Sequence, residues 1–267
     1  MSLRTRKSLG KRLLALRTTA KLTHRDLELI GSKAKLSRIE SGKQSIRQIE
    51  VEAWCSLCGA DDSTKAALVE MSKNARSEGW WEAFDRDVMP PWFASYVELE
   101  SEVASLRTYH PGVVHGLLQI EAYQRAIFAA DRDLPQVEQQ VAARLRRQQA
   151  AFNRESPLYI TAVIDEGVLR RQVGGPDVMA QQMDHLRAMN TKPHVDVHVL
   201  TFEAGAHLAM RGGFTLLEYE APDDPSMVFL ETDAGSRYEE RATTLERYGN
   251  IFKDIHSRST PLERLKE

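Results

Sequence analysis

The chain has 267 residues, of which 42% are hydrophobic and 28% are charged, and its formal net charge is −2. This composition is ordinary for a globular protein and leaves room for two domains. No apolar run approaches the roughly 18 residues of a membrane helix, and the basic N-terminus lacks the apolar stretch and cleavage site of a secretory signal. Two cysteines, Cys55 and Cys58, cannot form a disulfide framework, so we expect a cytoplasmic protein with no membrane partner.

The charge is divided unevenly along the chain. Counting Lys and Arg against Asp and Glu, residues 1–60 carry a net charge of +8 and the remaining residues carry −10. This division is typical of a protein in which a small basic module binds the phosphates of nucleic acid and a larger acidic domain does not. A solvated basic N-terminus would give the same count, so charge alone leaves both interpretations open.

The first 60 residues carry the signals of four short helices. Apolar residues from Leu9 to Ala20 repeat with helical spacing, which predicts a helix over residues 8–20. Thr23 can cap a second helix that runs toward Ile30, and the acidic residue in its first turn favours it.

The third and fourth helices follow directly. Ser32 can cap a helix over Lys33–Glu40, with Leu36 and Ile39 on its buried side, and Gly42 ends it. The segment 45–48 has the capping-box spacing for a fourth helix that would bury Ile49, Ala53 and Leu57. Four short helices with tight connections favour a helix-turn-helix domain.

The string Ser-Lys-Ala-Lys-Leu-Ser-Arg-Ile-Glu-Ser-Gly, residues 32–42, resembles the recognition helix and following turn of the phage-repressor-like (XRE-type) regulators. Leu22-Thr23 and Leu27 match the start of that family's second helix. His24 replaces the usual glutamine, and the interval from Leu27 to Ser32 is about two residues shorter than usual. The second helix or its turn must therefore be abbreviated.

The resemblance implies that double-stranded DNA is a partner and that the helix from Lys33 lies in the major groove. Lys and Arg can donate to guanine, and Ala34 can contact a thymine methyl group. Short polar and basic residues beside the helices can hold phosphates. The candidate DNA-binding residues are Thr23, His24, Arg25, Ser32, Lys33, Ala34, Lys35, Ser37, Arg38, Ser41 and Lys43. Glu40 is interpreted as structural, paired with a nearby arginine.

Cys55 and Cys58 have the spacing of a redox motif or of two zinc ligands. A structural zinc site needs about four ligands, and no second ligand pair lies nearby. We therefore favour two small apolar side chains in the core of the fourth helix.

Residues 1–62 are predicted to form the helix-turn-helix domain, 63–78 a connecting helix, and 79–267 a second domain. In that second domain helices are predicted over 96–109, 116–125, 137–152, 166–171, 177–189 and 240–256, with a short helix after Pro261, and strands over 158–164, 195–200, 214–219 and 227–231. The expected fold class is α+β, with an all-α N-terminal domain followed by an α+β domain built on a small, mainly antiparallel sheet.

The second domain also carries a resemblance, spread over about residues 75–260. It is similar to the C-terminal domain of the WhiJ-like regulators of actinomycetes in the segments Gly79–Trp81, Tyr96–Glu100, Gly116–Gln119, Arg144–Gln148, Asp165–Arg171, Gly174–Met179 and Gly213–Phe214. That resemblance implies a regulator that acts with a small BldB-like protein partner. We also expect a homodimer, because one helix-turn-helix reads only about half a site.

An enzymatic second domain is disfavoured. Asp165 ends a strand, but it is more simply the N-cap of the next helix. The histidines show no metal-ligand spacing, and His194 and His198 lie across a predicted strand with no metal partner on a shared face. No phosphate-binding loop or nucleophile motif is present, so no catalytic residue, metal or cofactor is predicted.

The candidate residues for a partner or ligand are Trp80, Trp81, Trp92, Phe93 and Gln119. For the aromatic members, a place in the core between two domains is the interpretation we favour. A ligand sensor should hold an enclosed pocket, whereas an antitoxin-like or scaffold protein should expose an apolar patch. Both alternatives remain open at the level of sequence.

Overall fold

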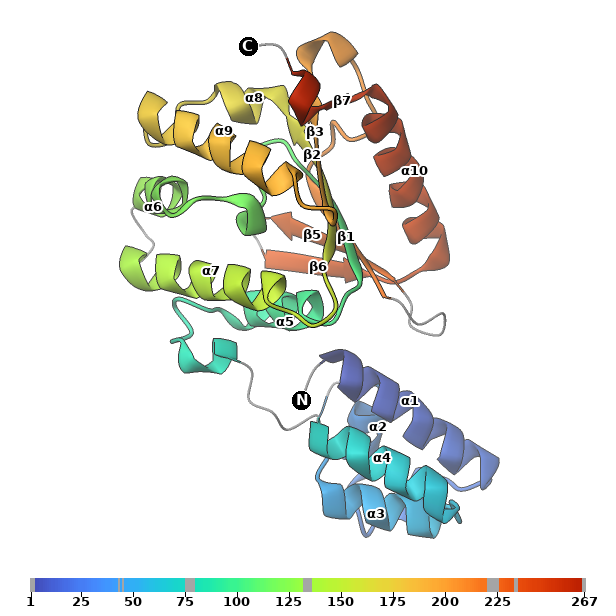
Figure 1. Cartoon of the computed structure of the whole chain (residues 1–267). Helices are drawn as coiled ribbons and strands as arrows, with labels where there is room; N and C mark the ends of the chain where they lie inside the picture. Colours follow the sequence, from blue (N-terminus) through green and yellow to red (C-terminus); the bar gives the residue numbers. More distant parts are fainter. Residues whose placement is uncertain are drawn as a thin grey trace. The chain divides into compact units, whose positions relative to one another are not determined.

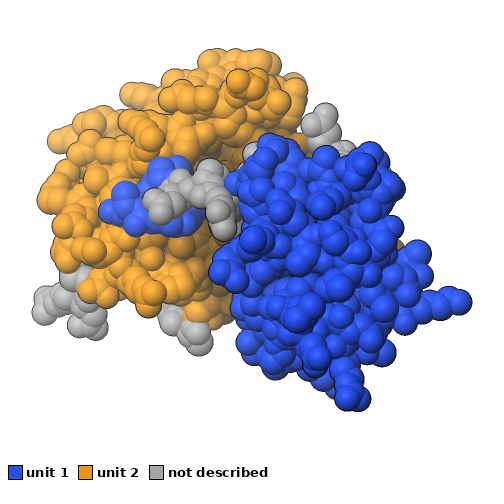
Figure 2. Space-filling model, turned by 90° about the horizontal axis from the view of Figure 1, so that it is seen from below, with its two compact units in different colours: residues 1–83 blue, residues 84–267 orange. Residues whose placement is uncertain are grey.

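The computed structural model describes residues 3–42, 44, 46–74, 80–131, 136–219, 226–232 and 235–265. The chain divides into two compact units, residues 1–83 and 84–267 (Figure 2). We call the first unit the head and the second the body, and each is described by itself. No helix in the described ranges is long and apolar enough to cross a membrane.

The head is built from helices around one apolar core. Its elements are α1 (Leu3–Thr19), the 3-10 turn η1 (His24–Leu27), α2 (Lys33–Glu40), α3 (Gln48–Leu57), α4 (Asp62–Asn74) and the 3-10 turn η2 (Trp80–Ala83). Leu13, Leu36, Trp54 and Leu68 come from four different helices and are at most 1% exposed. Since α4 packs against both α1 and α3, it is an integral helix of the head.

Helices α1 and α2 cross at close range. A Cβ atom at Gly10 would lie 2.4 Å from the carbonyl oxygen of Ile39, so only glycine fits at this crossing. Gly42 ends α2 with φ +69°, a left-handed conformation that glycine adopts without strain. The predicted bounds of this helix and its glycine stop are confirmed.

The predicted buried face of the fourth helix is wrong. Helix α3 begins at Gln48, where Glu50 accepts a hydrogen bond of 2.9 Å from the amide of the N-cap residue Arg47, and Ser45 lies outside the described residues. Ile49 is 67% exposed and Leu57 38% exposed. Because Glu50 is buried and paired with basic side chains, the buried face is turned toward it and includes Glu50, Val51, Trp54 and Cys55.

The two cysteines contribute to the core of the head, as predicted. Cys55 is fully buried and Cys58 is partly buried against the same cluster. Both are free thiols, and burial raises the pKa of each.

The body is α+β, as predicted, and its sheet has seven strands. The strands are β1 (Ser105–His110), β2 (Tyr159–Asp165), β3 (Val195–Leu200), β4 (Phe214–Glu218), β5 (Met227–Thr232), β6 (Gly235–Glu239) and β7 (Thr260–Pro261). Their order is β6-β5-β4-β1-β2-β3-β7. The pairs β1–β2 and β2–β3 are parallel and the other four are antiparallel, so the sheet is mixed but mainly antiparallel.

Helices cover both faces of this sheet. They are α5 (Pro91–Glu100), α6 (Glu121–Ala130), α7 (Val137–Phe152), α8 (Glu166–Arg170), α9 (Pro176–Asn190) and α10 (Ala242–Arg258), with 3-10 turns η3 (Gly116–Leu118), η4 (Phe202–Ala204) and η5 (Leu262–Arg264). Figure 1 shows α10 on one face and α6, α7 and α9 on the other. Phe252 and Ile255 of α10 are buried against Phe214 and Val228 of the sheet.

Two predicted helices of the body are corrected. The helix predicted over 96–109 ends at Glu100, and Ser105–His110 is a central strand whose parallel register pairs Leu106 with Ile160. The helix predicted from Gly116 begins only at Glu121, after the turn η3. By contrast, Asp165 caps α8 by accepting a hydrogen bond of 2.9 Å from the Gly167 amide, as predicted.

The β3 edge of the sheet is closed by local structure. The Val195 amide donates to the Lys192 carbonyl, and the Val197 amide donates to Asn190 Oδ1 at 2.7 Å. Val199 pairs with Thr260 of the two-residue strand β7. The outward amides of β3 are therefore occupied within the body.

Candidate nucleic-acid interface

Helix α2 presents a continuous exposed face. Ser32 caps it by accepting a hydrogen bond from the Lys35 amide. Leu36 and Ile39 are at most 1% exposed and fix which side faces the core. The side chains left in solvent are those of Lys33, Ala34, Ser37 and Arg38. Two cations, a methyl group and a hydroxyl thus share one surface.

The element before α2 is a single 3-10 turn. Sequence predicted a helix from Thr23 toward Ile30, abbreviated relative to the family pattern, and η1 extends only over His24–Leu27. Asp26 Oδ2 accepts hydrogen bonds of 2.7 Å from both the amide and the hydroxyl of Thr23. Leu27 is fully buried, whereas Arg25 is exposed.

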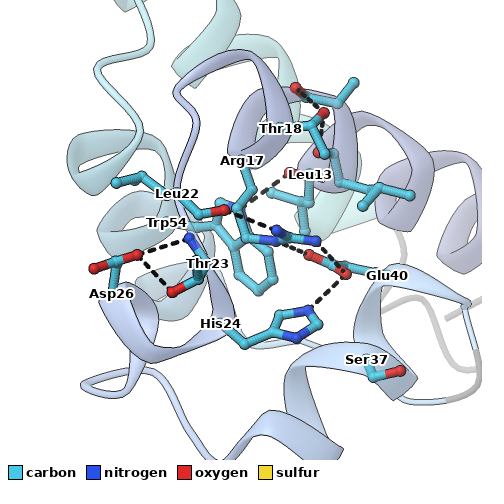
Figure 3. A network of polar contacts seen from close by, with 12 residues as sticks. Leu13, Arg17, Thr18, Leu22, Thr23, His24, Asp26, Ser37, Glu40 and Trp54 are labelled. Atoms are coloured by element: carbon cyan, nitrogen blue, oxygen red, sulfur yellow. Dashed lines mark hydrogen bonds and ion pairs between the residues drawn. The ribbon is translucent and has the colours of Figure 1, made fainter.

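Glu40 joins this turn to α1. Arg17 donates to its carboxylate through Nε and Nη2 at 2.5 and 3.1 Å, and the His24 ring lies 2.8 Å from Oε2. Arg17 also donates to the Leu22 carbonyl at 2.8 Å. Figure 3 shows Arg17 and His24 pointing toward Glu40 from different elements. The interpretation of Glu40 as an arginine-paired structural residue is confirmed, and His24 belongs to the same network.

Lys35 is directed inward. Its Nζ donates to the Ile30 carbonyl at 2.9 Å and to Glu50 Oε1 at 2.7 Å. Glu50 also accepts hydrogen bonds from the amide and the guanidinium of Arg47. The Lys35 ammonium therefore links α2 to α3, although sequence placed it among the candidate DNA contacts.

The remaining candidates lie at the end of α2. The Ser41 hydroxyl donates to the Ser37 and Arg38 carbonyls. Arg38 Nε donates to Gln44 Oε1 at 2.9 Å in an exposed position, so its guanidinium keeps other donors in solvent. Lys43 lies outside the described residues.

The body contains a cavity of about 220 Å³ between α5, α7 and the sheet. Phe93 and Gln119, two of the predicted ligand residues, both line it. Arg144 donates to Gln119 Oε1 at 2.7 Å and stacks over the Phe128 ring. Burial, and then the nearby Arg147, lower the pKa of Arg144 to about 10.

Arg147, which also lines this cavity, belongs to a buried ion pair. Arg147 donates to Glu100 Oε1 at 2.8 Å and to Oε2 at 2.5 Å, and the two side chains are 4% and 3% exposed. The guanidinium also lies over the rings of Phe93 and Tyr96. His110 and His115 also line the cavity. Burial lowers the pKa of His110 to about 4, and it holds the pKa of His115 well below its ordinary value.

Two family models match the chain. One is described as a helix-turn-helix domain and matches residues 8–68. The other is described as a domain of unknown function (DUF5753) and matches residues 93–264, which is more than half of the chain. The chain belongs to the DUF5753 family. Comparison with curated proteins and with solved structures gave no match.

The helix-turn-helix match spans η1, α2 and α3 and most of α1, so the head is a helix-turn-helix domain. This domain supports the assignment of the protein as a DNA-binding regulator. The DUF5753 domain includes every strand of the sheet and the cavity. Trp80 and Trp81 lie in the head unit, where they contact each other edge to face. Trp92 is 36% exposed, and its carbonyl accepts a hydrogen bond from Tyr238.

Sequence reasoning missed several functional candidates. The cavity residues Arg144 and Arg147 lay within the helix predicted over 137–152 and were not proposed as ligand contacts. Their spacing of three residues, which places them on one helix face, was the available signal. Glu100, the partner of Arg147, fell inside a helix that was predicted to continue through it.

The head is expected to lose stability in acid. Burial raises the pKa of Glu50, but hydrogen bonds from Arg47 and Lys35 outweigh it and bring the pKa to about 2, from an ordinary 4.5. The pKa of Glu40 is also lowered, because hydrogen bonds from Arg17 and His24 outweigh its burial. Both carboxylates stabilise the head fully above about pH 4.5. The Glu50 contribution is lost as the pH falls toward 2, and the Glu40 contribution is likewise lost in acid.

Hydrogen exchange of head peptides in the full chain, corrected for the intrinsic exchange rate, measures this loss. Glu50→Gln should remove about 1–2 kcal/mol at neutral pH and make the acid dependence shallower. The control is Glu70→Gln on α4. Glu70 is 62% exposed, and its contact with Lys73 is long, at 3.8 Å, so this pair should contribute little to stability. An acid dependence equally steep in Glu50→Gln and wild type would contradict the assignment.

Proposed function

We propose that the protein is a sequence-specific DNA-binding transcriptional regulator of the XRE type with a WhiJ-like body. The observation that carries this proposal is the exposed face of α2, where Lys33, Ala34, Ser37 and Arg38 stand opposite the buried Leu36 and Ile39. The helix-turn-helix match over residues 8–68 supports it. A recognition helix of this kind reads base edges in the major groove.

The candidate residues divide into three roles. Lys33 and Arg38 would donate to guanine O6 or N7, and Ala34 would contact a thymine methyl group. Arg25 and Ser37 would contact bases or phosphates beside the helix. The other described candidates would act by holding α2 in place, since their polar atoms are engaged within the head: Thr23, His24, Ser32, Lys35 and Ser41.

Selection of an operator from random duplexes, with the full chain, tests the proposal. Lys33→Ala and Arg38→Ala should each cost about 1–3 kcal/mol in operator affinity if the residue makes a bidentate base contact. The matched control is Lys73→Ala, an exposed lysine of α4, which packs on α1 and α3. Affinity should also fall steeply with salt. If the double variant Lys33→Ala with Arg38→Ala bound the operator like wild type, α2 would not be the recognition helix.

We propose further that two chains bind together. One helix-turn-helix contacts about half a site, so the selected operator should show two-fold related half-sites about one helical turn apart. Sedimentation of the protein–DNA complex then gives two chains per duplex. A single, asymmetric half-site bound by one chain would contradict the homodimer.

Two observations bear on what the body binds. The cavity beside Phe93, Gln119 and Arg144 favours a small ligand that alters operator affinity. The loop after β3 exposes Phe202, Leu208 and Met210 by 63%, 57% and 69%, which favours a protein partner. The WhiJ-like resemblance makes a small BldB-like protein the partner to test first, and a scaffold role is the second candidate function.

A further inference from the structure

Three side chains on the α10 face of the sheet converge on one point. Asp196 and His198 are two residues apart on β3, so both project from the same face. His256 comes from the last turn of α10, which packs against β3. One ligand atom from each of the three lies within 4.8 Å of the other two. The two histidines are 58 positions apart in the chain, so only the fold brings them together.

The distances suit a metal ion with little rearrangement. Asp196 Oδ1 lies 3.1 Å from His198 Nε2, and Asp196 Oδ2 lies 3.7 Å from His256 Nε2. The two imidazole rings are 4.3 Å apart between centroids. With metal–ligand bonds of about 2.1 Å, neighbouring ligands in a tetrahedral site are about 3.4 Å apart. The two measured separations lie on either side of that value.

Ser259 orients His198 for such a role. The Ser259 hydroxyl donates to the His256 carbonyl at 2.8 Å, and its oxygen lies 3.1 Å from His198 Nδ1. Because a hydroxyl has one proton, Ser259 then accepts from Nδ1–H of His198. The neutral ring so held carries its lone pair on Nε2, which faces Asp196. A second hydrogen bond of this kind is what a metal-ligating histidine normally makes.

We propose that Asp196, His198 and His256 bind one divalent first-row transition metal ion, with Zn²⁺ as the reference ion. Two imidazoles and a carboxylate form a donor set that such ions favour. Asp196 is 54% exposed and His256 39%, so water has access to the remaining coordination positions. The ion would tie the end of α10 to β3 and stabilise the body in proportion to its concentration.

Equilibrium dialysis of the full chain against Zn²⁺, and the visible spectrum of the Co²⁺ form, test the proposal. Dialysis should show one bound ion per chain. The Co²⁺ spectrum should be that of a tetrahedral or five-coordinate ion with histidine ligands. His198→Ala, His256→Gln and Asp196→Asn should each weaken binding by at least about tenfold, and Ser259→Ala by about 10- to 100-fold. His194→Ala removes a neighbouring imidazole outside the cluster and should leave affinity unchanged.

The competing reading is an ion pair between Asp196 and protonated histidines, without a metal. It predicts no bound Zn²⁺ in the wild-type chain, which would overturn the proposal. Metal binding that survives in all three ligand variants, and is lost in Cys55→Ala with Cys58→Ala, would assign the ion to the head and overturn the proposal as well. Asp196→Asn preserves the side-chain shape at an exposed position, so loss of binding there reports on ligation rather than on folding.

Discussion

Replacing Glu100 by Leu should destabilise the body by about 3–5 kcal/mol, because it leaves the Arg147 guanidinium buried without its carboxylate. Both nitrogens that face Glu100 would lose charge-assisted hydrogen bonds. Arg147 has little access to bulk solvent, since it is 4% exposed and lies over the rings of Phe93 and Tyr96. Denaturant titration with hydrogen exchange of β1 and β2 peptides measures the loss.

The matched double variant separates the charge from the packing. Glu100→Leu with Arg147→Met removes both ions while filling much of the same volume, and should recover most of the lost stability. Double-variant losses equal to the sum of the two single losses would show that the pair is not coupled. The head provides an internal control, because its exchange should be unaffected in all three variants.

Trp54→Ala should destabilise the head by about 3–5 kcal/mol. Trp54 is fully buried at the centre of the head core, and its Nε1 donates to the Leu13 carbonyl at 3.1 Å, which ties α3 to α1. Small helical domains rarely have more stability than this to lose. The variant should therefore also lose operator binding, although Trp54 has no exposed surface.

Trp54→Phe is the informative comparison. It keeps most of the apolar volume and removes the indole donor, so its cost should be about 1–3 kcal/mol and operator binding should survive. Hydrogen exchange of the head peptides distinguishes the two variants. Equal stability of Trp54→Ala and wild type would show that the head core does not depend on this side chain.

Helix α2 was predictable because its signals are local. Ser32, the pair Leu36 and Ile39, and Gly42 define the cap, the buried face and the stop of α2 within eleven residues. The face of α3 was not predictable in the same way. Its orientation depends on Glu50, whose buried carboxylate is paired both with the adjacent Arg47 and with Lys35, fifteen positions earlier in the chain.

The strands that were missed are those without a local pattern. In strand β1, Leu106 continues the helical spacing of the apolar residues in the preceding helix, which favoured a helix. The strand is defined instead by its pairing with β2 and β4, which lie far away in the chain. Strand β6 is mostly polar and is defined only by its pairing with β5. Strand β7 has two residues and exists only because β3 offers an edge.

The site in the DUF5753 domain illustrates the same limit. Phe93 and Gln119, which line the cavity, were singled out from the sequence, but the positively charged lining residues Arg144 and Arg147 were not. In the sequence, His198 was considered together with His194, because the two are close in the chain. The neighbour that matters for His198 is His256, which arrives through the packing of α10 on β3.

The closed β3 edge has a consequence for self-association. Unpaired strand edges recruit foreign strands, and this is the usual beginning of sheet-to-sheet aggregation. Pro261 has no amide hydrogen, and Val195 and Val197 have already donated theirs to the Lys192 carbonyl and the Asn190 side chain. A strand from another molecule therefore finds no donors along β3. In the described part of the sheet, β6 is the strand at the opposite end.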